Sequence, residues 1–293
     1  MFRNIVLGGE PGTFHGRDDD LYVQHLPAHA RELDKLASVA KAVLPDDAIV
    51  MDIGANIGLT PVLLARHAAQ VVALEPSPDN FSYLKRNLSE NRVTNVLAHQ
   101  VAASSSLGTI SFHQAQFGAG SSQVDARHIA QNNTPSIVVP AVRVDDLVTE
   151  LGLQRLDFVK IDVEGFEIDV LRGMEKTITG LRPTVFLEFN SWCMIAFRNL
   201  NPRELLDLIL EQFEFVFWVA EGNCIRITPG TGPIAFLHEN LVRHHCMTDV
   251  ICTSSRSVAE KIEAIRFKPS AEEQLSRAAE SVVDRAKRLL RRR

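Results

Sequence analysis

The sequence has few cysteines and no long apolar run, and each absence excludes a class of protein. Its four cysteines form no Cys-x-x-Cys pair, so we expect buried free thiols instead of zinc ligands or disulfides. No apolar stretch is long enough to cross a bilayer, and residues 1–13 lack the basic start and apolar centre of a signal peptide. These absences predict a cytoplasmic protein without a metal site.

An excess of positive charge is also absent from the chain as a whole. The formal net charge is −5, which argues against a surface that binds nucleic acid. With 293 residues, 45% of them hydrophobic, the chain can form one large domain with a small appendage. Aromatic residues are scarce, at 6%. We expect core packing for four of them, with stacking on a bound ring as the alternative; these are Trp192, Phe197, Trp218 and Phe236.

The most informative stretch is residues 48–58, with the sequence AIVMDIGANIG. Its apolar run ends at Asp52, and Gly54 and Gly58 then permit a tight turn before a helix-patterned segment, which predicts a buried strand followed by a turn and a helix. A flat ligand can lie over the carboxyl end of such a strand. A second acid, Glu75, ends the next apolar run, QVVALE. We expect Glu75 to accept hydrogen bonds from both ribose hydroxyls of a nucleoside.

The chemistry of this turn favours a nucleoside without phosphate. A dinucleotide site needs Gly-x-Gly-x-x-Gly, so that backbone N–H groups can approach the pyrophosphate. Here Asn56 replaces the middle glycine, and Asp52 precedes the turn. A carboxylate at this place repels a pyrophosphate but attracts the ammonium and sulfonium of S-adenosylmethionine. The turn therefore favours S-adenosylmethionine, although a short motif of this kind also occurs in ordinary strand-to-helix turns.

Strands and helices alternate around this stretch. After a short strand at residues 2–7 and a polar connection, which could alternatively be a flap over the donor, apolar periodicity predicts a helix at 30–44. Helices at 59–68 and from 78 alternate with strands at 70–75 and 96–101, which is typical of a parallel sheet covered on both faces. Further strands are expected at 184–189, 214–220 and 249–253, and a helix at 202–213. An excursion beyond this sheet is expected from strands at 108–113 and 137–144.

A second motif, LDFVKIDVEGFEIDVLRG at residues 156–173, places two carboxylates at the end of another apolar strand. The strand ends in Asp162, and Glu164 precedes a glycine and a helix. Buried carboxylates cost free energy unless they have partners. A functional role for Asp162 and Glu164 is therefore favoured over a structural one.

Five motifs occur in the order typical of one family: DIGANIG, ALEPSPDNF, VDDL, KIDVEGFE and LEFN. Over residues 30–253 the chain resembles the FkbM-type methyltransferases. The resemblance implies an α/β fold of class I, Rossmann-like, with a seven-stranded, mostly parallel sheet, helices on both faces and an antiparallel last strand. It implies methylation of hydroxyl oxygens on sugars, glycans or polyketide products. The methyltransferase domain is expected at 30–255, after an N-terminal strand and loop extension at 1–29 and before a C-terminal helical extension at 256–293.

The motifs then give each candidate residue a role. Methyl transfer to a hydroxyl needs an acceptor held in line with the donor and a nearby base. We expect catalysis from Asp162, Glu164 and Glu188, and acceptor binding by Asn190, Ser121 and Ser122. The expected donor-binding residues are Asp52, Gly54, Asn56, Gly58, Glu75, Pro76, Gln100, Val101, Ala102 and Asp162. No metal is assigned, although a divalent ion between Asp162 and Glu164 is an alternative that EDTA would test.

Several alternatives stay open at this point. A dehydrogenase is disfavoured by the missing glycine. A methyltransferase acting on nucleic-acid or protein amines should carry an Asn/Asp-Pro-Pro-Tyr tetrapeptide, where this chain has DVEG. A non-catalytic donor-binding scaffold is a third reading. After Asp284 the chain ends in six Lys or Arg residues without an acid, which is either a solvated helix end or a peripheral attachment to an anionic membrane or acidic partner.

Overall fold

The computed structural model describes residues 1–113, 136–220 and 222–267. Its main sheet has eight strands in the order β12-β11-β13-β10-β9-β3-β4-β5. Their bounds are β3 (Ile49–Ile53), β4 (Gln70–Leu74), β5 (Val96–His99), β9 (Phe158–Ile161), β10 (Thr184–Asn190), β11 (Phe215–Ala220), β12 (Asn223–Arg226) and β13 (Met247–Thr253). The five strands from β10 to β5 are parallel, and β13 lies antiparallel between β10 and β11, as predicted.

The expected number of seven strands was wrong by one. The additional strand is β12, which forms an antiparallel hairpin with β11 at the edge of the sheet. Its four residues are half-buried or exposed, so they show neither a continuous apolar run nor a clear alternation.

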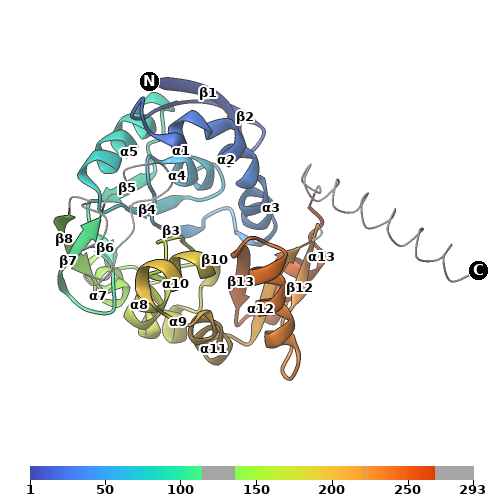
Figure 1. Ribbon diagram of the computed structural model, residues 1–293. Helices are drawn as coiled ribbons and strands as arrows, with labels where there is room; N and C mark the ends of the chain where they lie inside the picture. The colour runs from blue at the N-terminus through green and yellow to red at the C-terminus, as the bar shows by residue number, and fades with distance from the viewer. Residues whose placement is uncertain (114–135, 221, 268–293) are drawn as a thin grey trace, which may run out of the picture.

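Helices cover both faces of the sheet, as the alternating pattern predicted. One face carries α3 (Asp34–Val43), α4 (Leu59–Leu64), α5 (Pro78–Glu90) and α13 (Arg256–Ala264). The other carries α7 (Val144–Glu150), α8 (Glu167–Gly173), α9 (Glu175–Leu181), α10 (Ser191–Arg198), α11 (Pro202–Gln212) and α12 (Gly232–Val242). Figure 1 shows α3, α4 and α5 above the central strands and α8, α9 and α11 below them.

Alternate residues of the buried strands pack into two separate apolar cores. In β3, Val50 packs with the helices of the first face, whereas Met51 and Ile53 pack with those of the second. This arrangement follows from the two-residue period of a strand. Because both faces are covered, the strands read as continuous apolar runs, and the polar residues that occur where they end stand out.

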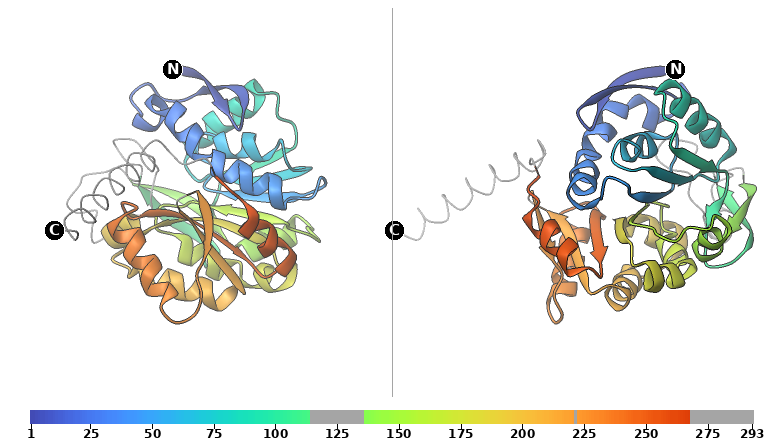
Figure 2. Two further views of the ribbon diagram at one scale, coloured as in Figure 1. Left: turned by 90° about the vertical axis from the view of Figure 1, so that its right-hand side faces the viewer. Right: turned by 180° about the vertical axis from the view of Figure 1, so that it is seen from behind.

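The N-terminal residues form more structure than the sequence predicted. The expected strand, β1 (Phe2–Leu7), pairs with a second strand, β2 (Glu10–His15), and two short helices follow, α1 (Leu21–Gln24) and α2 (Leu26–Glu32). Leu7, Phe14 and Leu26 are fully buried in the same apolar core as α3 and α4. Figure 2 shows this hairpin at one end of the molecule and α12 toward the other. The domain boundaries at residues 29–30 and 255–256 stay a prediction.

The expected excursion beyond the main sheet is confirmed. A separate three-stranded sheet has the order β6-β8-β7, with β6 (Ala102–Ala103), β7 (Gly108–His113) and β8 (Ser136–Val142). Ser121, Ser122 and the basic residues after Asp284 lie outside the described residues. In the described part of the chain, none of the helices combines the length and apolar character that a membrane span requires.

Candidate functional site

The glycine turn brings the ends of three strands into contact. Gly54 has φ of 87°, and its N–H donates to the carbonyl of Leu74 at the end of β4 at 3.0 Å. A Cβ at position 54 would lie 1.8 Å from the carbonyl oxygen of Asp162, which follows β9. Only glycine fits this approach of the two chains. Gly58, with φ of 102°, begins α4 against Leu84 of α5.

Glu75 is tied to this turn by both of its carboxylate oxygens. Oε2 accepts the backbone N–H of Asn56 at 2.8 Å, and Oε1 accepts that of Ser77 at 2.9 Å. Burial raises the pKa of Glu75 to about 7, against the lowering effect of these two bonds. Each carboxylate oxygen has a second lone pair, and the side chain of Asn80 also lowers the pKa of Glu75. The two backbone bonds therefore leave Glu75 with capacity to accept a hydrogen bond from a ligand. Pro76 connects Glu75 to Ser77, which caps α5.

A buried lysine that the sequence analysis assigned no role links the two acids at the strand ends. The Nζ atom of Lys160 lies 3.5 Å from Asp52 and 3.2 Å from Asp162, and it donates to the carbonyl of Gly54 at 3.1 Å. Burial by itself lowers the pKa of Lys160, but the charges of Asp162 and Asp52 raise it above its usual range. Lys160 is therefore a permanent cation beneath the glycine turn.

Asp52 is fully buried and is not a free carboxylate. Its Oδ2 accepts the hydroxyl of Thr60 at 2.5 Å, and its Oδ1 faces Lys160 but makes no hydrogen bond among the described residues. Burial raises its pKa, while Lys160 lowers it. With Asp52 and Asp162 ionised, the group with Lys160 carries a net charge of −1, so the attraction for a cationic ligand is smaller than two isolated carboxylates would give.

Glu164 lies in the loop between β9 and α8 in a strained conformation. Its φ is 53°, a left-handed value that is uncommon for residues other than glycine. Oε2 accepts hydrogen bonds from Nδ2 of Asn190 at 3.1 Å and from Sγ of Cys193 at 3.0 Å. Burial and the nearby charge of Asp162 raise the pKa of Glu164 to about 7. A carboxylate with this pKa can take up a proton near neutral pH.

Asn190 connects Glu164 to a second carboxylate. Its Nδ2 also donates to Glu188 at 3.2 Å, and its Oδ1 accepts the N–H of Cys193 at the start of α10. Burial, followed by the charges of Asp162 and Glu164, raises the pKa of Glu188 well above its usual range. The side chain of Asn190 is nearly buried, and its bonds place it to orient the two carboxylates.

One further carboxylate, that of Asp249, adjoins Glu188. Asp249 of β13 is its backbone neighbour across the strand pair and lies 3.8 Å from Lys35 of α3. Burial raises the pKa of Asp249 to about 6. The edge of the sheet where β3, β9 and β10 end thus holds five carboxylates, and a buried lysine, Lys160, contacts two of them, Asp52 and Asp162.

Three candidate donor-binding residues lie where the chain leaves β5: Gln100 is exposed, and Val101 and Ala102 are buried. This position adjoins Glu75, whose N–H donates to the carbonyl of His99 at 3.1 Å. Among the described residues, no group of three or more His, Cys, Asp or Glu side chains is arranged to hold a metal ion.

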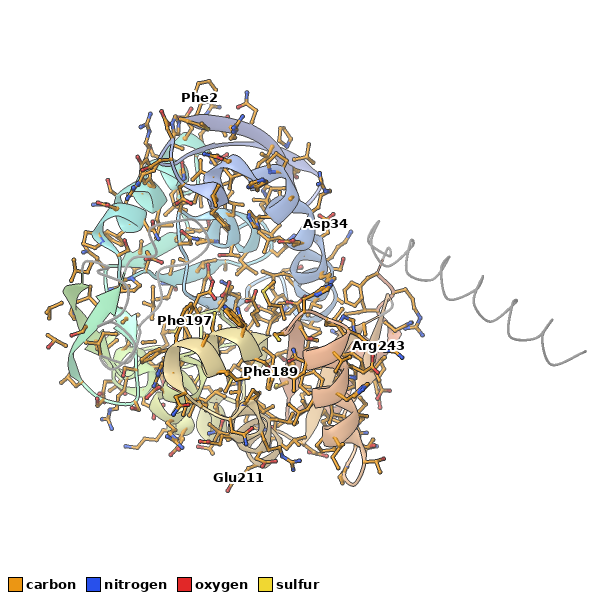
Figure 3. All side chains as sticks on the ribbon, viewed as in Figure 1. Phe2, Asp34, Phe189, Phe197, Glu211 and Arg243 are labelled. Atoms are coloured by element: carbon orange, nitrogen blue, oxygen red, sulfur yellow. The ribbon has the colours of Figure 1, made fainter. Side chains whose placement is uncertain are left out.

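Two of the four singled-out aromatic residues are buried in the core. Trp218 and Phe236 are both buried and pack edge to face, with ring centroids 5.7 Å apart. Phe197 of α10, labelled in Figure 3, is half-buried. Trp192, in contrast, is 60% exposed, so core packing, predicted for all four rings, is wrong for this one.

The comparisons with known proteins agree with this arrangement. A family model described as the methyltransferase FkbM domain matches residues 52–215. Methyltransferase 1 of Beauveria bassiana is 32% identical over 174 residues, which cover 53% of this chain and 69% of that protein. The hexuronic acid methyltransferase AglP of Haloferax volcanii is 29% identical over 57% of this chain and 63% of its own length. The 2-O-methyltransferase NoeI of Sinorhizobium fredii is 29% identical over 60% of this chain and 76% of its own length.

The match of the family model begins at Asp52 and covers the glycine turn, Glu75, the loop of Glu164 and the end of β10. It therefore spans more than half of the chain and nearly all of the acids described above. The protein is a methyltransferase, and it belongs to the FkbM methyltransferase family.

Proposed function

We propose that the protein transfers a methyl group from S-adenosylmethionine to a hydroxyl oxygen of a sugar, glycan or polyketide-type acceptor. The observation that carries the proposal is the pairing of a nucleoside-compatible carboxylate, Glu75, with a second carboxylate of raised pKa, Glu164, at the same edge of the sheet. Two matched relatives are named for methylating hexuronic acid and a 2-O position, which supports a sugar hydroxyl as the acceptor.

The described residues fit this donor. Glu75 has acceptor capacity for ribose hydroxyls beyond its two backbone bonds, and Asn56 and Ser77 hold it in place. Gly54 lets the backbone of the turn pack directly against the carbonyl of Asp162, which brings the ends of β3 and β9 together at the proposed site. The net negative charge of Asp52, Lys160 and Asp162 favours the cationic methionine end over a pyrophosphate. Gly58, Pro76, Gln100, Val101 and Ala102 stay in the proposed donor site by their position.

S-adenosylmethionine, when bound, supplies a methyl group already activated by a positively charged sulfur. The protein then has to hold the acceptor hydroxyl on the far side of that carbon and remove its proton. We assign the proton to Glu164, with Asp162 as the neighbouring carboxylate that helps to raise its pKa. Glu188, whose raised pKa favours a protonated carboxyl, can donate a hydrogen bond to an acceptor oxygen. Asn190 donates a hydrogen bond to each of Glu164 and Glu188 and so fixes the two carboxylates relative to each other.

The proposal is tested by release of adenosylhomocysteine with a panel of neutral sugars, uronates, lipid-free glycans, polyketide alcohols and primary amines. Turnover with a hydroxyl acceptor, lost in Glu164→Gln and retained in Glu211→Gln, supports it. Glu211 is a suitable control because it is exposed on α11, far from the site (Figure 3). Turnover with amines alone would instead favour an N-methyltransferase.

We also propose, from the sequence of the tail, that the basic residues after Asp284 allow peripheral contact with an anionic membrane. Cytoplasmic residence, acceptor binding by Ser121 and Ser122, and the absence of a resident metal belong to the same proposal.

A further inference from the structure

We propose that Glu167 is a positioning residue for Glu164: its buried carboxylate holds the backbone on both sides of Glu164 and thereby fixes the side chain of the proposed base. Oε1 of Glu167 accepts the N–H of Val163 and the N–H of Gly165, each at 3.2 Å. These two N–H groups flank Glu164 in the sequence. This inference rests on the proposed function, because it assigns Glu167 a role only through Glu164.

The loop needs such a restraint because its backbone is unfavourable. Glu164 has φ of 53° and Gly165 has φ of 98°, both in the left-handed region that residues with a Cβ seldom adopt. A Cβ at Gly165 would lie 3.1 Å from the backbone of Cys193, so the loop is also pressed against α10. A strained loop keeps its shape only where surrounding groups determine it.

The side chain of Glu164 is held by other elements than its backbone. Its Oε2 accepts hydrogen bonds from Nδ2 of Asn190, at the end of β10, and from Sγ of Cys193, near the start of α10. Glu167 belongs to the first turn of α8. Glu164 is therefore fixed by three elements: the backbone around it is held by α8, and its side chain is held by β10 and α10.

The burial of Glu167 argues against a role in packing alone. Its side chain is 1% exposed, and Oε2 makes no hydrogen bond among the described residues. Burying a carboxylate with an unsatisfied oxygen is costly, and an apolar side chain of similar size would fill the same space without that cost. What Leu would lack is an acceptor for the two N–H groups beside Glu164.

An ordinary helix cap could use the same two bonds, and the test separates the two roles. Glu167→Gln keeps a carbonyl oxygen that can accept both N–H groups, whereas Glu167→Leu keeps the volume but has no acceptor. Hydrogen exchange at the amides of Val163 and Gly165 reports the bonds directly and needs no methyl acceptor. We expect exchange at both amides to accelerate at least tenfold in Glu167→Leu and to stay near the wild-type rate in Glu167→Gln.

Turnover per folded molecule then distinguishes positioning from capping. We expect Glu167→Leu to lose roughly 10- to 100-fold in kcat, with the affinity for adenosylhomocysteine changed less than about threefold, and Glu167→Gln to restore most of kcat. The pH profile of Glu167→Leu should lose the limb near pH 7 that Glu164 gives the wild type. The double variant Glu164→Gln/Glu167→Leu should be no slower than Glu164→Gln alone, because Glu167 acts through Glu164.

Three outcomes overturn the proposal. Unchanged amide exchange in Glu167→Leu would show that the two bonds do not hold the loop. Accelerated exchange with wild-type kcat would reduce Glu167 to a helix cap. The kcat of the double variant could also fall below that of Glu164→Gln by the same factor by which Glu167→Leu lowers the wild-type kcat. That result would show that Glu167 acts independently of Glu164. If Glu164→Gln itself keeps full turnover, the proposed base is wrong. The exchange rates still report whether Glu167 holds the N–H groups of Val163 and Gly165.

Discussion

Replacing Lys160 with methionine should be among the most damaging single changes in the protein, and the magnitude follows from the geometry. The variant leaves Asp52 without the cation 3.5 Å away and Asp162 without the one 3.2 Å away. At an effective dielectric constant of about 20, each attraction is on the order of 5 kcal/mol before solvation is considered. Removing one partner of a buried ion pair typically costs about 3–5 kcal/mol of unfolding free energy.

We expect the midpoint of thermal unfolding to fall by about 10 °C in Lys160→Met, because each kcal/mol corresponds to about 2–4 °C in a domain of this size. Scanning calorimetry measures the shift, and Lys176→Met, at an exposed position of α9, is the matched control. The double variant Lys160→Met/Asp52→Asn should recover part of the loss, since it removes the unpaired buried carboxylate.

The pH dependence of Lys160→Met has a definite sign. Without the cation, burial should raise the pKa of Asp52 further in the folded protein than in the wild type. The folded state then binds more protons than the unfolded chain, so the stability of the variant should increase as the pH falls toward 5. If Lys160→Met is as stable as Lys176→Met at pH 8, the reasoning is refuted. Lys160 would then contribute nothing to the electrostatics of the turn.

Further predictions concern the donor, the base, the metal and the tail. Glu75→Ala should raise the dissociation constant of adenosylhomocysteine about 100-fold by calorimetry, since it removes two charge-assisted hydrogen bonds worth roughly 1.5 kcal/mol each; an unchanged constant would remove Glu75 from the ribose site. Because burial raises the pKa of Glu75 to about 7, the stability that its protonated form contributes is lost as the pH rises through 7. Relative to wild type, Glu75→Gln should therefore gain about 3 kcal/mol in urea unfolding between pH 4.5 and pH 8. Glu164→Gln should lower kcat by about 10²–10⁴-fold without weakening donor binding, and activity should survive EDTA. Deleting residues 285–293 should abolish cosedimentation with anionic vesicles, and neutral vesicles are the control. If the full-length and the shortened protein cosediment equally with anionic vesicles, the tail makes no membrane contact.

Much of the fold could be predicted because the buried strands are continuous apolar runs that end in glycines or acids. The stretch that ends at Asp52 is the clearest case, and β3 occupies nearly the residues expected. The second strand of the N-terminal hairpin was missed because EPGTFH contains Pro and Gly, which indicate a turn. An edge strand tolerates both, since one side of its backbone is unpaired.

The candidate site could be predicted in part for the same reason. Acids that end parallel strands meet at one edge of the sheet, and the structure brings Asp162, Glu164 and Glu188 together there, while Glu75 is joined to the glycine turn. Lys160 and Glu167 were missed, because a charged residue is usually assumed to face solvent. The signal was present in FVKI, where a lysine interrupts a four-residue strand that is otherwise apolar and fully buried. A charge in such a strand needs a buried partner, and Asp162 follows two residues later.

The central claim, that the edge of the sheet near Asp52 and Glu75 binds a phosphate-free, cationic nucleoside, is tested most directly by isothermal titration of the wild-type protein with S-adenosylmethionine and with NAD. We expect saturable binding of S-adenosylmethionine that Glu75→Ala weakens, and no measurable heat from NAD. Binding of NAD with no heat from S-adenosylmethionine would contradict the account.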